Sequence, residues 1–454
     1  MSRYTSATDD DRRAMLDAIG ARSVDALFDE VVPPGVRLDR SLDLPPGKPE
    51  QEVYAYLRDL AARNVSAEDE ISFLGAGMYD HYVPALIDSI LARSEFLTPY
   101  TPYQPEVSQG TLQLMFEYQT AISELTRLPV SNATLYEAPS ALASAGWLAY
   151  QKNRRARFVV SRGLHPHSRE ALATMSAGWG TTIDEVPLAD GVTDAAALAE
   201  AVSEEVSAVF LQYPNFLGAV EDLEALVPAA KETGAVVVVQ CDAIPLGILR
   251  PPGDFGVDIA VGEGQPLGNR LDYGGPSFGF FAAREEYLRK MPGRIAGETT
   301  DADGRRGFVL TLQTREQHIR REKATHNITT AQTLNALAGV VYLSWLGREG
   351  LVELGELLLQ RTAYAREALS AIEGVELLHS QPVVREFAVA LDAGVDAVIE
   401  RCAAAGVNPG YPLGRDYPEY GNGLLVAITE QRSKSDIDRL ARALQAAVRE
   451  AVPA

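Results

Sequence analysis

The strongest constraint on the fold is an alternation of apolar strands and amphipathic helices between residues 157 and 241. Short apolar segments at 157–161, 207–213 and 235–241 are predicted to be strands. Segment 221–232 carries apolar residues at helical spacing. Segment 235–241 is apolar almost throughout, which is typical of a central parallel strand covered on both faces. The alternation therefore predicts an α/β fold with a mostly parallel sheet and right-handed crossovers.

Polar side chains follow these predicted strands. His165, Asn215 and Asp242 each come shortly after the end of a strand segment. Ligands of open α/β sheets bind beyond the carboxyl ends of the strands. We therefore expect a ligand cleft, or the remains of one, at this edge of the sheet.

The chain divides into three predicted regions. Residues 1–95 form an N-terminal helical arm whose short helices are joined by polar and Pro-rich loops. Residues 96–325 form the large α/β domain, and residues 326–454 a smaller C-terminal α+β domain. The arm has little core of its own, so we expect it to wrap another subunit or the main body.

Composition excludes several classes of function. Sixty-two acidic residues against 41 Lys and Arg give a net charge of −21, which argues against a nucleic acid or an anionic membrane as partner. No apolar run is long enough to cross a bilayer, and residues 1–13 contain no signal core. Two cysteines, Cys241 and Cys402, suit a reducing cytoplasm. The six histidines and two cysteines show no ligand spacing, so no metal site is expected.

Several long sequence strings carry a resemblance to a known family. They lie at 72–84, at 98–113, at 262–268 with 274–276, and at 292–294 followed by 304–328. Over essentially its whole length, the chain resembles the glycine decarboxylase (P-protein) family of the glycine cleavage system, and within it subunit 1, the alpha subunit of the two-chain form. The resemblance implies fold type I of the pyridoxal-phosphate (PLP) enzymes.

The family's reaction and partners follow from the resemblance. Glycine bound to PLP loses its carboxylate as CO2, and the remaining aminomethyl group passes to the lipoyl arm of H-protein. The resemblance implies an α2β2 assembly with subunit 2 and binding of lipoylated H-protein. It also implies that PLP is bound to a lysine of subunit 2.

Gln265 stands where the Schiff-base lysine of a working enzyme is expected. No lysine lies between Asp242 and Gly279. This chain therefore cannot hold PLP as a Schiff base at that position. The loss agrees with the resemblance to subunit 1, in which the lysine-bearing site belongs to the partner.

Other cofactor positions are expected to be vestigial. Asp242 matches the carboxylate that pairs with the pyridine nitrogen in active relatives, and His165 matches the residue that stacks on the cofactor ring. Ordinary strand-end and loop hydrogen bonds are the alternative for both residues. The turn expected to bind the phosphate, residues 136–140, has no glycine, places Glu137 there and lacks one amide donor at Pro139.

A Pro-rich loop before the first large-domain helix carries the candidate catalytic residues. They are Tyr100, Tyr103, Ser108 and Gln109, with Glu106 nearby. In fold type I dimers this region commonly reaches an active site, where such groups orient a substrate by hydrogen bonds. We expect them to complete the partner's site. The alternative is a loop that only packs at the subunit interface.

Two further groups are candidate binding residues. Gly274, Gly275 and Gly279 are expected to approach the partner's cofactor phosphate in trans, because glycine allows close backbone contact. The alternative is a tight turn entering a strand. Arg315, Arg320 and Arg321 form a basic island with Arg305 and Arg306, suited to the carboxylate of glycine or acidic patches of H-protein, or else to a solvated helix face.

Two other functions remain open from the residues. A complete PLP enzyme such as an aminotransferase needs a lysine that Gln265 replaces. A structural or regulatory scaffold without catalysis needs no such lysine, but it has little use for the strings at 98–113 and 315–328.

Overall fold

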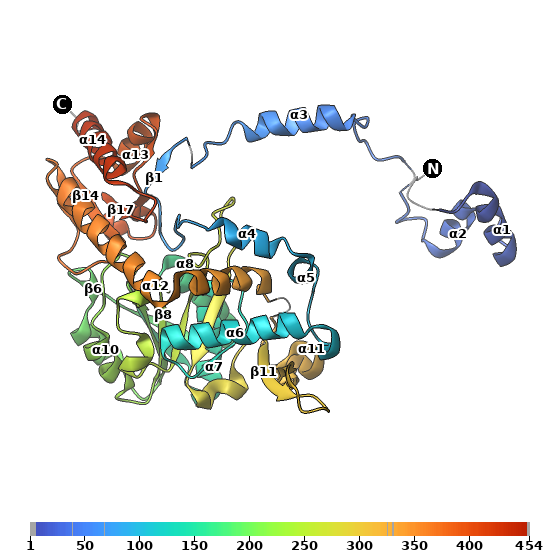
Figure 1. Ribbon diagram of the computed structural model, residues 1–454, viewed down its shortest axis with the longest axis horizontal. Helices are drawn as coiled ribbons and strands as arrows, with labels where there is room; N and C mark the ends of the chain where they lie inside the picture. Colours follow the sequence, from blue (N-terminus) through green and yellow to red (C-terminus); the bar gives the residue numbers. More distant parts are fainter. Residues whose placement is uncertain (1–5, 39, 68, 325, 329–330, 452–454) are drawn as a thin grey trace. The chain divides into compact units, whose positions relative to one another are not determined.

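The computed structural model describes residues 6–38, 40–67, 69–324, 326–328 and 331–451. The chain consists of two compact units, Met1–Val65 and Ser66–Ala454 (Figure 1). Within the described residues, no helix combines the length and apolar character needed to span a membrane.

Among its described residues, the first unit contains three helices, none of which has a buried side chain. These are α1 (Asp9–Ile19), α2 (Val24–Val31) and α3 (Glu50–Ala61). Thr8 forms a capping box with Asp11 at the start of α1, and Ser23 caps α2, so local signals fix where these two helices begin. The unit therefore has helices without a core of their own.

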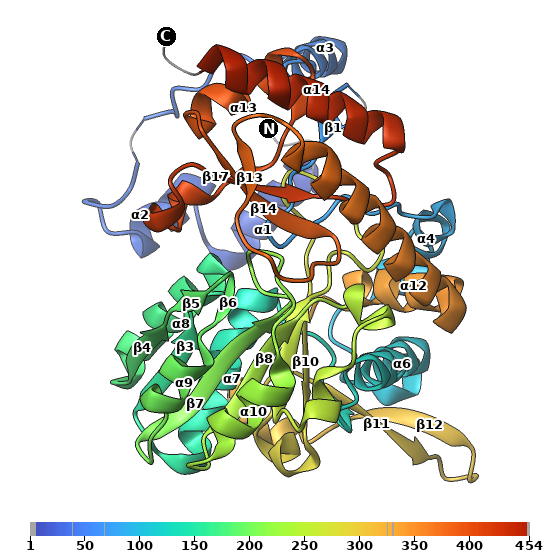
Figure 2. The same ribbon diagram turned by 90° about the vertical axis from the view of Figure 1, so that its left-hand side faces the viewer.

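A seven-stranded mixed sheet forms the centre of the second unit (Figure 2). Its strands, in order across the sheet, are β2 (Val130–Ser131), β10 (Gly279–Ala283), β9 (Ile259–Glu263), β8 (Val236–Cys241), β7 (Val206–Tyr213), β3 (Arg157–Ser161) and β4 (Thr182–Val186). The five strands from β9 to β4 are parallel, whereas β10 runs antiparallel to both β9 and β2. The predicted mostly parallel sheet is confirmed.

Helices cover both faces of this sheet. They are α6 (Gln109–Thr126), α7 (Ala138–Asn153), α8 (Pro166–Trp179), α9 (Ala195–Ala201) and α10 (Leu223–Lys231). Along β8, Val236 and Val238 belong to the core under α7 and α8, whereas Val237 and Val239 belong to the core with α6 and α10. Burial on both sides explains why the strand is apolar at successive positions.

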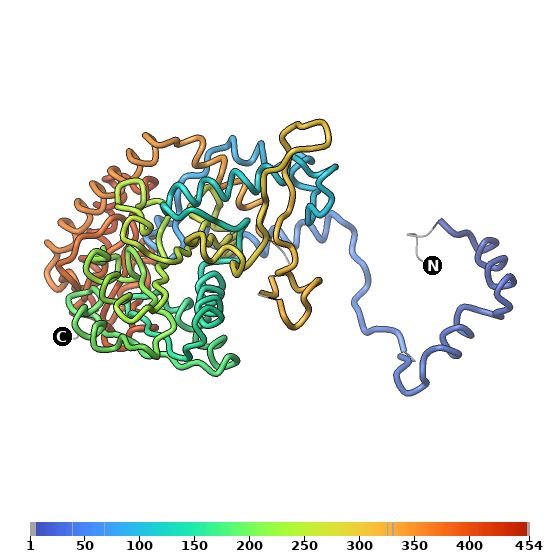
Figure 3. The backbone as a smooth tube through the Cα atoms, turned by 90° about the horizontal axis from the view of Figure 1, so that it is seen from below, coloured from blue at the N-terminus to red at the C-terminus, as the bar shows by residue number. Residues whose placement is uncertain are grey.

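A long hairpin extends from the large region. Its strands β11 (Ile295–Thr300) and β12 (Arg306–Thr311) run side by side and both contact α6 (Figure 3). Short helices follow: η5 (Gln313–Arg315), α11 (Gln317–Arg320) and η6 (Arg321–Lys323). Other short elements are β5 (Leu188–Ala189), β6 (Val192–Thr193), η2 (Pro245–Gly247), η3 (Pro252–Phe255) and η4 (Glu285–Lys290).

The C-terminal part begins with α12 (Thr333–Ser370), which is interrupted at Gly347. A four-stranded antiparallel sheet follows, made of β13 (Val375–Leu377), β14 (Glu386–Leu391), β17 (Gly423–Ala427) and β16 (Tyr411–Pro412). Helices α13 (Val395–Ala404) and α14 (Lys434–Ala451) complete this part, with the short helices η7 (Leu413–Arg415) and η8 (Pro418–Tyr420). This is the α+β architecture predicted for the end of the chain.

An early segment of the chain joins this C-terminal part. β1 (Ile71–Ser72) pairs in parallel with β15 (Val407–Asn408). The chain then continues through α4 (Ala85–Leu91), α5 (Ser94–Leu97) and η1 (Pro105–Val107) to α6. The region boundaries predicted near residues 95 and 325 remain predictions, and residue 325 is outside the described residues.

Candidate functional site

The carboxyl ends of β8 and β9 bring the predicted cofactor residues together. Asp242 directly follows β8, and Gln265 comes shortly after β9. Gln265 is buried, with only 1% of its surface exposed. The segment 73–84, called the strap below, contacts Gln265 and Glu386 through Tyr79.

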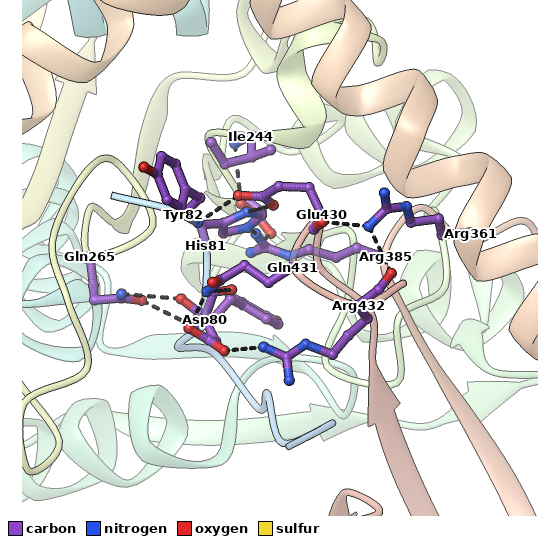
Figure 4. A network of polar contacts seen from close by, with 12 residues as sticks. Asp80, His81, Tyr82, Ile244, Gln265, Arg361, Arg385, Glu430, Gln431 and Arg432 are labelled. Carbon is purple, nitrogen blue, oxygen red and sulfur yellow. Dashed lines mark hydrogen bonds and ion pairs between the residues drawn. The ribbon is translucent and has the colours of Figure 1, made fainter. Parts of the chain in front are cut away.

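Gln265 binds the backbone of the strap through both ends of its amide (Figure 4). Its Oε1 accepts a hydrogen bond from the Tyr79 N–H at 2.9 Å, and its Nε2 donates to the Tyr79 carbonyl at 3.2 Å. Nε2 also donates to the carbonyl of Asn269 at 2.7 Å. The residue at the lost lysine position is therefore a fully bonded structural amide.

Asp242 forms an ion pair with Arg385, which stands just before β14. The same guanidinium donates to Nε2 of His81 and lies 3.3 Å from the centre of the Tyr79 ring. His81 in turn donates from Nδ1 to Glu430 at 2.6 Å (Figure 4). Asp242, which the sequence predicts at a vestigial cofactor position, is thus bonded within the chain.

Glu386 fixes the middle of the strap from β14. It accepts hydrogen bonds from the Ala76 N–H at 2.8 Å and from the Tyr79 hydroxyl at 2.7 Å. Burial raises the pKa of Glu386 to about 7. A Cβ at Gly75 would lie 2.4 Å from the Glu386 Oε1, so the strap needs glycine to approach this closely.

His165 also faces the strap. Its Nδ1 accepts from the His167 N–H at 3.1 Å, so its Nε2 carries the proton and donates to the Ala76 carbonyl at 2.9 Å. Burial lowers the pKa of His165 to about 4, which keeps the imidazole neutral. Gly77 packs against this ring with a φ of +104°. His165, predicted to match a residue that stacks on a cofactor ring, instead contacts the backbone of the strap.

The N-terminus of α7, where the phosphate is expected, is closed by carboxylates. Glu137 accepts from the Ser140 N–H at 3.1 Å, and Glu263 accepts from the Ala138 N–H at 3.2 Å. Pro139 has no amide hydrogen. Burial raises the pKa of Glu263 to about 7. The donors that would bind a phosphate are therefore already bonded to side chains of this chain.

The space left between the strap and the sheet is small. A cavity of about 50 Å³ remains among Gly77, His165, Asp242 and Glu386. Small-molecule sites have volumes of about 300–1,000 Å³, so this cavity is much too small for a cofactor. The residues of this cleft do not fit PLP.

Comparison with known proteins identifies the family. The family model for the glycine cleavage system P-protein matches residues 2–444. The chain belongs to the glycine cleavage system P-protein family. It is 47% identical to the probable glycine dehydrogenase (decarboxylating) subunit 1 of Geotalea uraniireducens, over 98% of this chain and 100% of that relative.

Solved structures agree with this family and with the fold. A crystal structure of glycine decarboxylase (P-protein) of the glycine cleavage system, in inhibitor-bound form, matches with a TM-score of 0.90 at 43% identity, over 98% of this chain and 100% of that one. The cysteine desulfurase CsdA from Escherichia coli matches with a TM-score of 0.64 at 16% identity, over 85% and 96%. The predicted PLP fold type I is confirmed, as is the predicted P-protein family.

In this member of the P-protein family, the two tyrosines of the candidate catalytic loop differ in exposure and in their contacts with the rest of the chain. Tyr100 is 75% exposed and Tyr103 44% exposed. The Tyr103 hydroxyl lies 3.4 Å from Arg294, and its ring meets that of His318 edge-on. The roles predicted for the two tyrosines remain predictions.

Ser108 and Gln109, at the start of α6, are more strongly tied to this chain. Ser108 precedes α6 but makes no side-chain cap. Gln109 accepts from the Phe308 N–H at 2.8 Å and donates to the Phe308 carbonyl at 2.9 Å. Gln109 thereby fastens β12 to α6, and its predicted catalytic role, like that of Ser108, remains a prediction.

The predicted glycines divide into two environments. Gly274 and Gly275 lie in an open turn beside Tyr273, which is 93% exposed. Gly274 has a φ of +90°, a conformation that favours glycine. Gly279 lies in β10, where a Cβ would come 2.5 Å from the carbonyl oxygen of Glu137. The turn is open to a partner, whereas Gly279 is required by packing inside the chain.

The structure separates the three predicted arginines. Arg315 is buried and donates to the carbonyls of Met291, Gly293 and Leu312. Burial lowers the pKa of Arg315 to about 10. Arg320 and Arg321 are exposed at the end of α11. Carboxylate recognition remains a prediction for all three.

A larger pocket, which the sequence did not predict, lies beside the segment that carries Arg320 and Arg321. Its volume is about 990 Å³. The polar residues that line it include Tyr103, Arg294, His318, Arg321 and His326. His326 accepts from the Ile328 N–H at 3.3 Å, and burial, followed by nearby arginines, lowers its pKa to about 4. Scattered positions and the lack of a spacing pattern hid this pocket from sequence reasoning.

Proposed function

We propose that the chain is the alpha subunit of glycine decarboxylase. Together with subunit 2 it decarboxylates glycine and transfers the aminomethyl group to the lipoyl arm of H-protein, with release of CO2. The observation that carries this proposal is the full-length similarity to subunit 1 in a chain whose lysine position holds Gln265.

The cofactor in this proposal belongs to subunit 2. PLP bound to a lysine of that chain supplies the electron sink that stabilises the carbanion left by CO2. The strap, Gln265 and the carboxylates at α7 support this assignment, because they occupy the equivalent positions here. Asp242 and His165 are then structural residues of this chain.

The contribution of this chain is to complete the partner's site. Tyr100 and Tyr103 present phenol groups from an exposed loop, and such groups orient a substrate by hydrogen bonds. The open turn at Gly274 and Gly275 is the candidate contact with the partner's phosphate. Each of these roles requires subunit 2 to contact the segment concerned, the loop at Tyr100 and Tyr103 or the turn at Gly274 and Gly275.

The proposed assembly is α2β2 and cytoplasmic, with lipoylated H-protein as the second partner. Arg320 and Arg321 are the candidate contacts for acidic groups of H-protein or for the carboxylate of glycine. Arg315 is the weaker candidate, since it donates to three carbonyls of its own chain. We also propose that the chain divides into the three regions 1–95, 96–325 and 326–454.

Reconstitution tests the proposed function. The purified chain is mixed with subunit 2 and lipoylated H-protein, and glycine-dependent exchange of labelled CO2 is measured. We expect activity only when both chains are present. Full activity of subunit 2 with H-protein alone would reduce this chain to a scaffold and contradict the proposal.

Borohydride trapping provides an independent test of where the cofactor resides. Reduction in the presence of PLP should leave a stable adduct on a lysine of subunit 2 and none on this chain. Subunit 2 in the same reaction serves as the positive control. An adduct on one of this chain's six lysines would contradict the assignment.

A further inference from the structure

The cleft beyond β8 and β9 is filled by the chain's own strap. We propose that Gln265 is a positioning residue that binds the strap where a cofactor would lie, and thereby fixes where α4 and the loop with Tyr100 and Tyr103 begin. This inference rests on the proposed function, because it assigns that loop to the site of subunit 2.

The chemistry of glutamine suits this role. Gln265 accepts from the Tyr79 N–H and donates to the Tyr79 carbonyl, so one side chain fixes both polar groups of a buried residue. A lysine ammonium has three donors and no acceptor, so it would leave the Tyr79 N–H unpaired. The residue found at the lost lysine position is therefore one that binds a peptide backbone in both directions.

Four further contacts hold the same short segment. The Ala76 N–H donates to Glu386, and the Ala76 carbonyl accepts from His165. The Tyr79 ring packs on Arg385 while its hydroxyl donates to Glu386. These partners line the same small cavity as Asp242, so the strap binds the cleft as an internal ligand.

The strap is continuous with the exposed tyrosine loop. At its beginning it follows β1, which pairs with β15. At its end Pro84 precedes α4, and α4 packs against α12 (Figure 1). After α5 the chain reaches Tyr100 and Tyr103. A displacement of the strap would therefore move the start of the segment that carries both tyrosines.

Hydrogen–deuterium exchange of the full chain tests the contact directly. We expect Gln265→Ala to raise the exchange rate of the amides in residues 76–83 at least about tenfold, because a buried pairing partner is lost. The matched control is Gln119→Ala. Gln119 is also buried, accepts from the Ala296 N–H at 2.8 Å and donates to the Ala296 carbonyl at 3.0 Å, away from the cleft. Its loss should leave exchange in the strap unchanged.

The assembly with subunit 2 tests the consequence for the partner's site. Gln265→Ala should lower kcat/KM for glycine on the order of tenfold, since misplaced positioning groups lose much of their effect. Gln265→Glu keeps the acceptor for the Tyr79 N–H and should recover part of the rate. If the wild-type assembly itself is inactive, the proposed function fails, whereas the exchange measurement still decides whether Gln265 holds the strap.

Gln265→Lys tests whether the strap occupies the cleft. We expect no borohydride-stable PLP adduct at residue 265, because the strap and the carboxylates at Glu137 and Glu263 remain in place. Retention of PLP by this variant would overturn the proposal. Unchanged exchange in residues 76–83 of Gln265→Ala would overturn it as well.

A milder variant keeps the test decisive if Gln265→Ala fails to fold. Tyr79→Phe removes only the hydroxyl that donates to Glu386 and keeps the ring on Arg385. It should raise strap exchange about threefold to tenfold and lower kcat/KM in the assembly by a smaller factor than Gln265→Ala. No change in either measurement would contradict the coupling between strap and loop.

Discussion

In the cleft beyond β8 and β9, polar side chains are buried and bonded to one another, whereas the tyrosines of the 100–109 loop are exposed. The guanidinium of Arg385 binds Asp242 and His81, and the amide of Gln265 binds the strap. Tyr100 by contrast leaves three quarters of its surface to solvent. The two regions belong to one chain but differ in what their polar groups bind.

This difference distinguishes polar side chains that stabilise the fold from polar side chains that are available to another molecule. A buried polar side chain is satisfied within the chain because an unpaired one is strongly unfavourable. An exposed tyrosine in a loop has no such requirement, so its hydroxyl is available to another molecule. Substitutions in the cleft should therefore lower stability and affect activity only through the strap, whereas substitutions in the loop should lower activity without lowering stability.

The largest stability loss is expected for Arg385→Ala. The substitution leaves Asp242 without its ion-pair partner and Tyr79 without its cation. Breaking a buried pair from one side destabilises by about 3–5 kcal/mol, which urea unfolding of the purified chain can measure. Arg270→Ala is the control, because Arg270 pairs with Asp88 at the surface and should lose no more than about 1 kcal/mol. Equal losses would erase the contrast between cleft and surface.

The next effect is the pH dependence introduced by Glu386. Its pKa in the folded chain is raised to about 7 from an ordinary value of 4.5, mainly by burial. The folded state thus holds a proton that the unfolded state releases, so stability falls as pH rises from about 4.5 to 7. Glu386→Gln should remove a decline in the free energy of unfolding on the order of 3 kcal/mol over this pH range.

The difference between wild type and Glu386→Gln isolates this effect. Glu263 contributes a decline of the same sign, and His165 contributes the opposite one, since its lowered pKa favours the folded state as pH rises from 4 to 6.5. Both are present in each protein and cancel in the difference. A difference in unfolding free energy that does not change between pH 4.5 and 7 would contradict the assignment.

A smaller effect, on activity only, is expected in the loop. Tyr100→Ala should lower kcat of the assembly with subunit 2 on the order of tenfold, because an orienting hydrogen bond is lost. Its stability should change by less than about 0.5 kcal/mol, since the side chain is exposed. Trp345→Ala, a comparably exposed aromatic on α12, should leave both quantities unchanged. A large stability loss in Tyr100→Ala would place this tyrosine with the structural residues.

The smallest effect is expected at the closed phosphate turn. Glu137→Ala removes the N-cap of α7 and should cost about 1 kcal/mol in thermal or urea unfolding. Glu137→Asp, which keeps a capping carboxylate, should lose less. A gain in stability would show that Glu137 is strained there, which would reopen the question of what the turn binds.

The sequence predicted the sheet well and the cleft poorly, for a physical reason. The strand predicted at 235–241 is β8 at Val236–Cys241, and the helix predicted at 221–232 is α10 at Leu223–Lys231. Continuous burial and helical periodicity act over a few residues, so they leave a local pattern. Such patterns do not tell which distant segments meet.

The contacts of the cleft have no local pattern. Arg385 meets Asp242 across 143 residues, and Gln265 meets Tyr79 across 186. The sequence showed that Gln265 stands at the lysine position, but it did not show that Gln265 binds Tyr79. Arg315, Arg320 and Arg321 were grouped because they are close in sequence, yet the turn at η5 points Arg315 into the core.

The first unit has a consequence for how the chain is handled in a cell. None of the residues of its three helices is buried, and Phe28, Val31 and Leu57 are among the large apolar side chains it exposes. Chaperones and proteases recognise exposed apolar segments of this kind. We therefore expect the chain to have a shorter half-life when it is synthesised without subunit 2 than with it, as pulse–chase labelling can measure. Synthesis of subunit 2 would then be a condition for accumulating this chain.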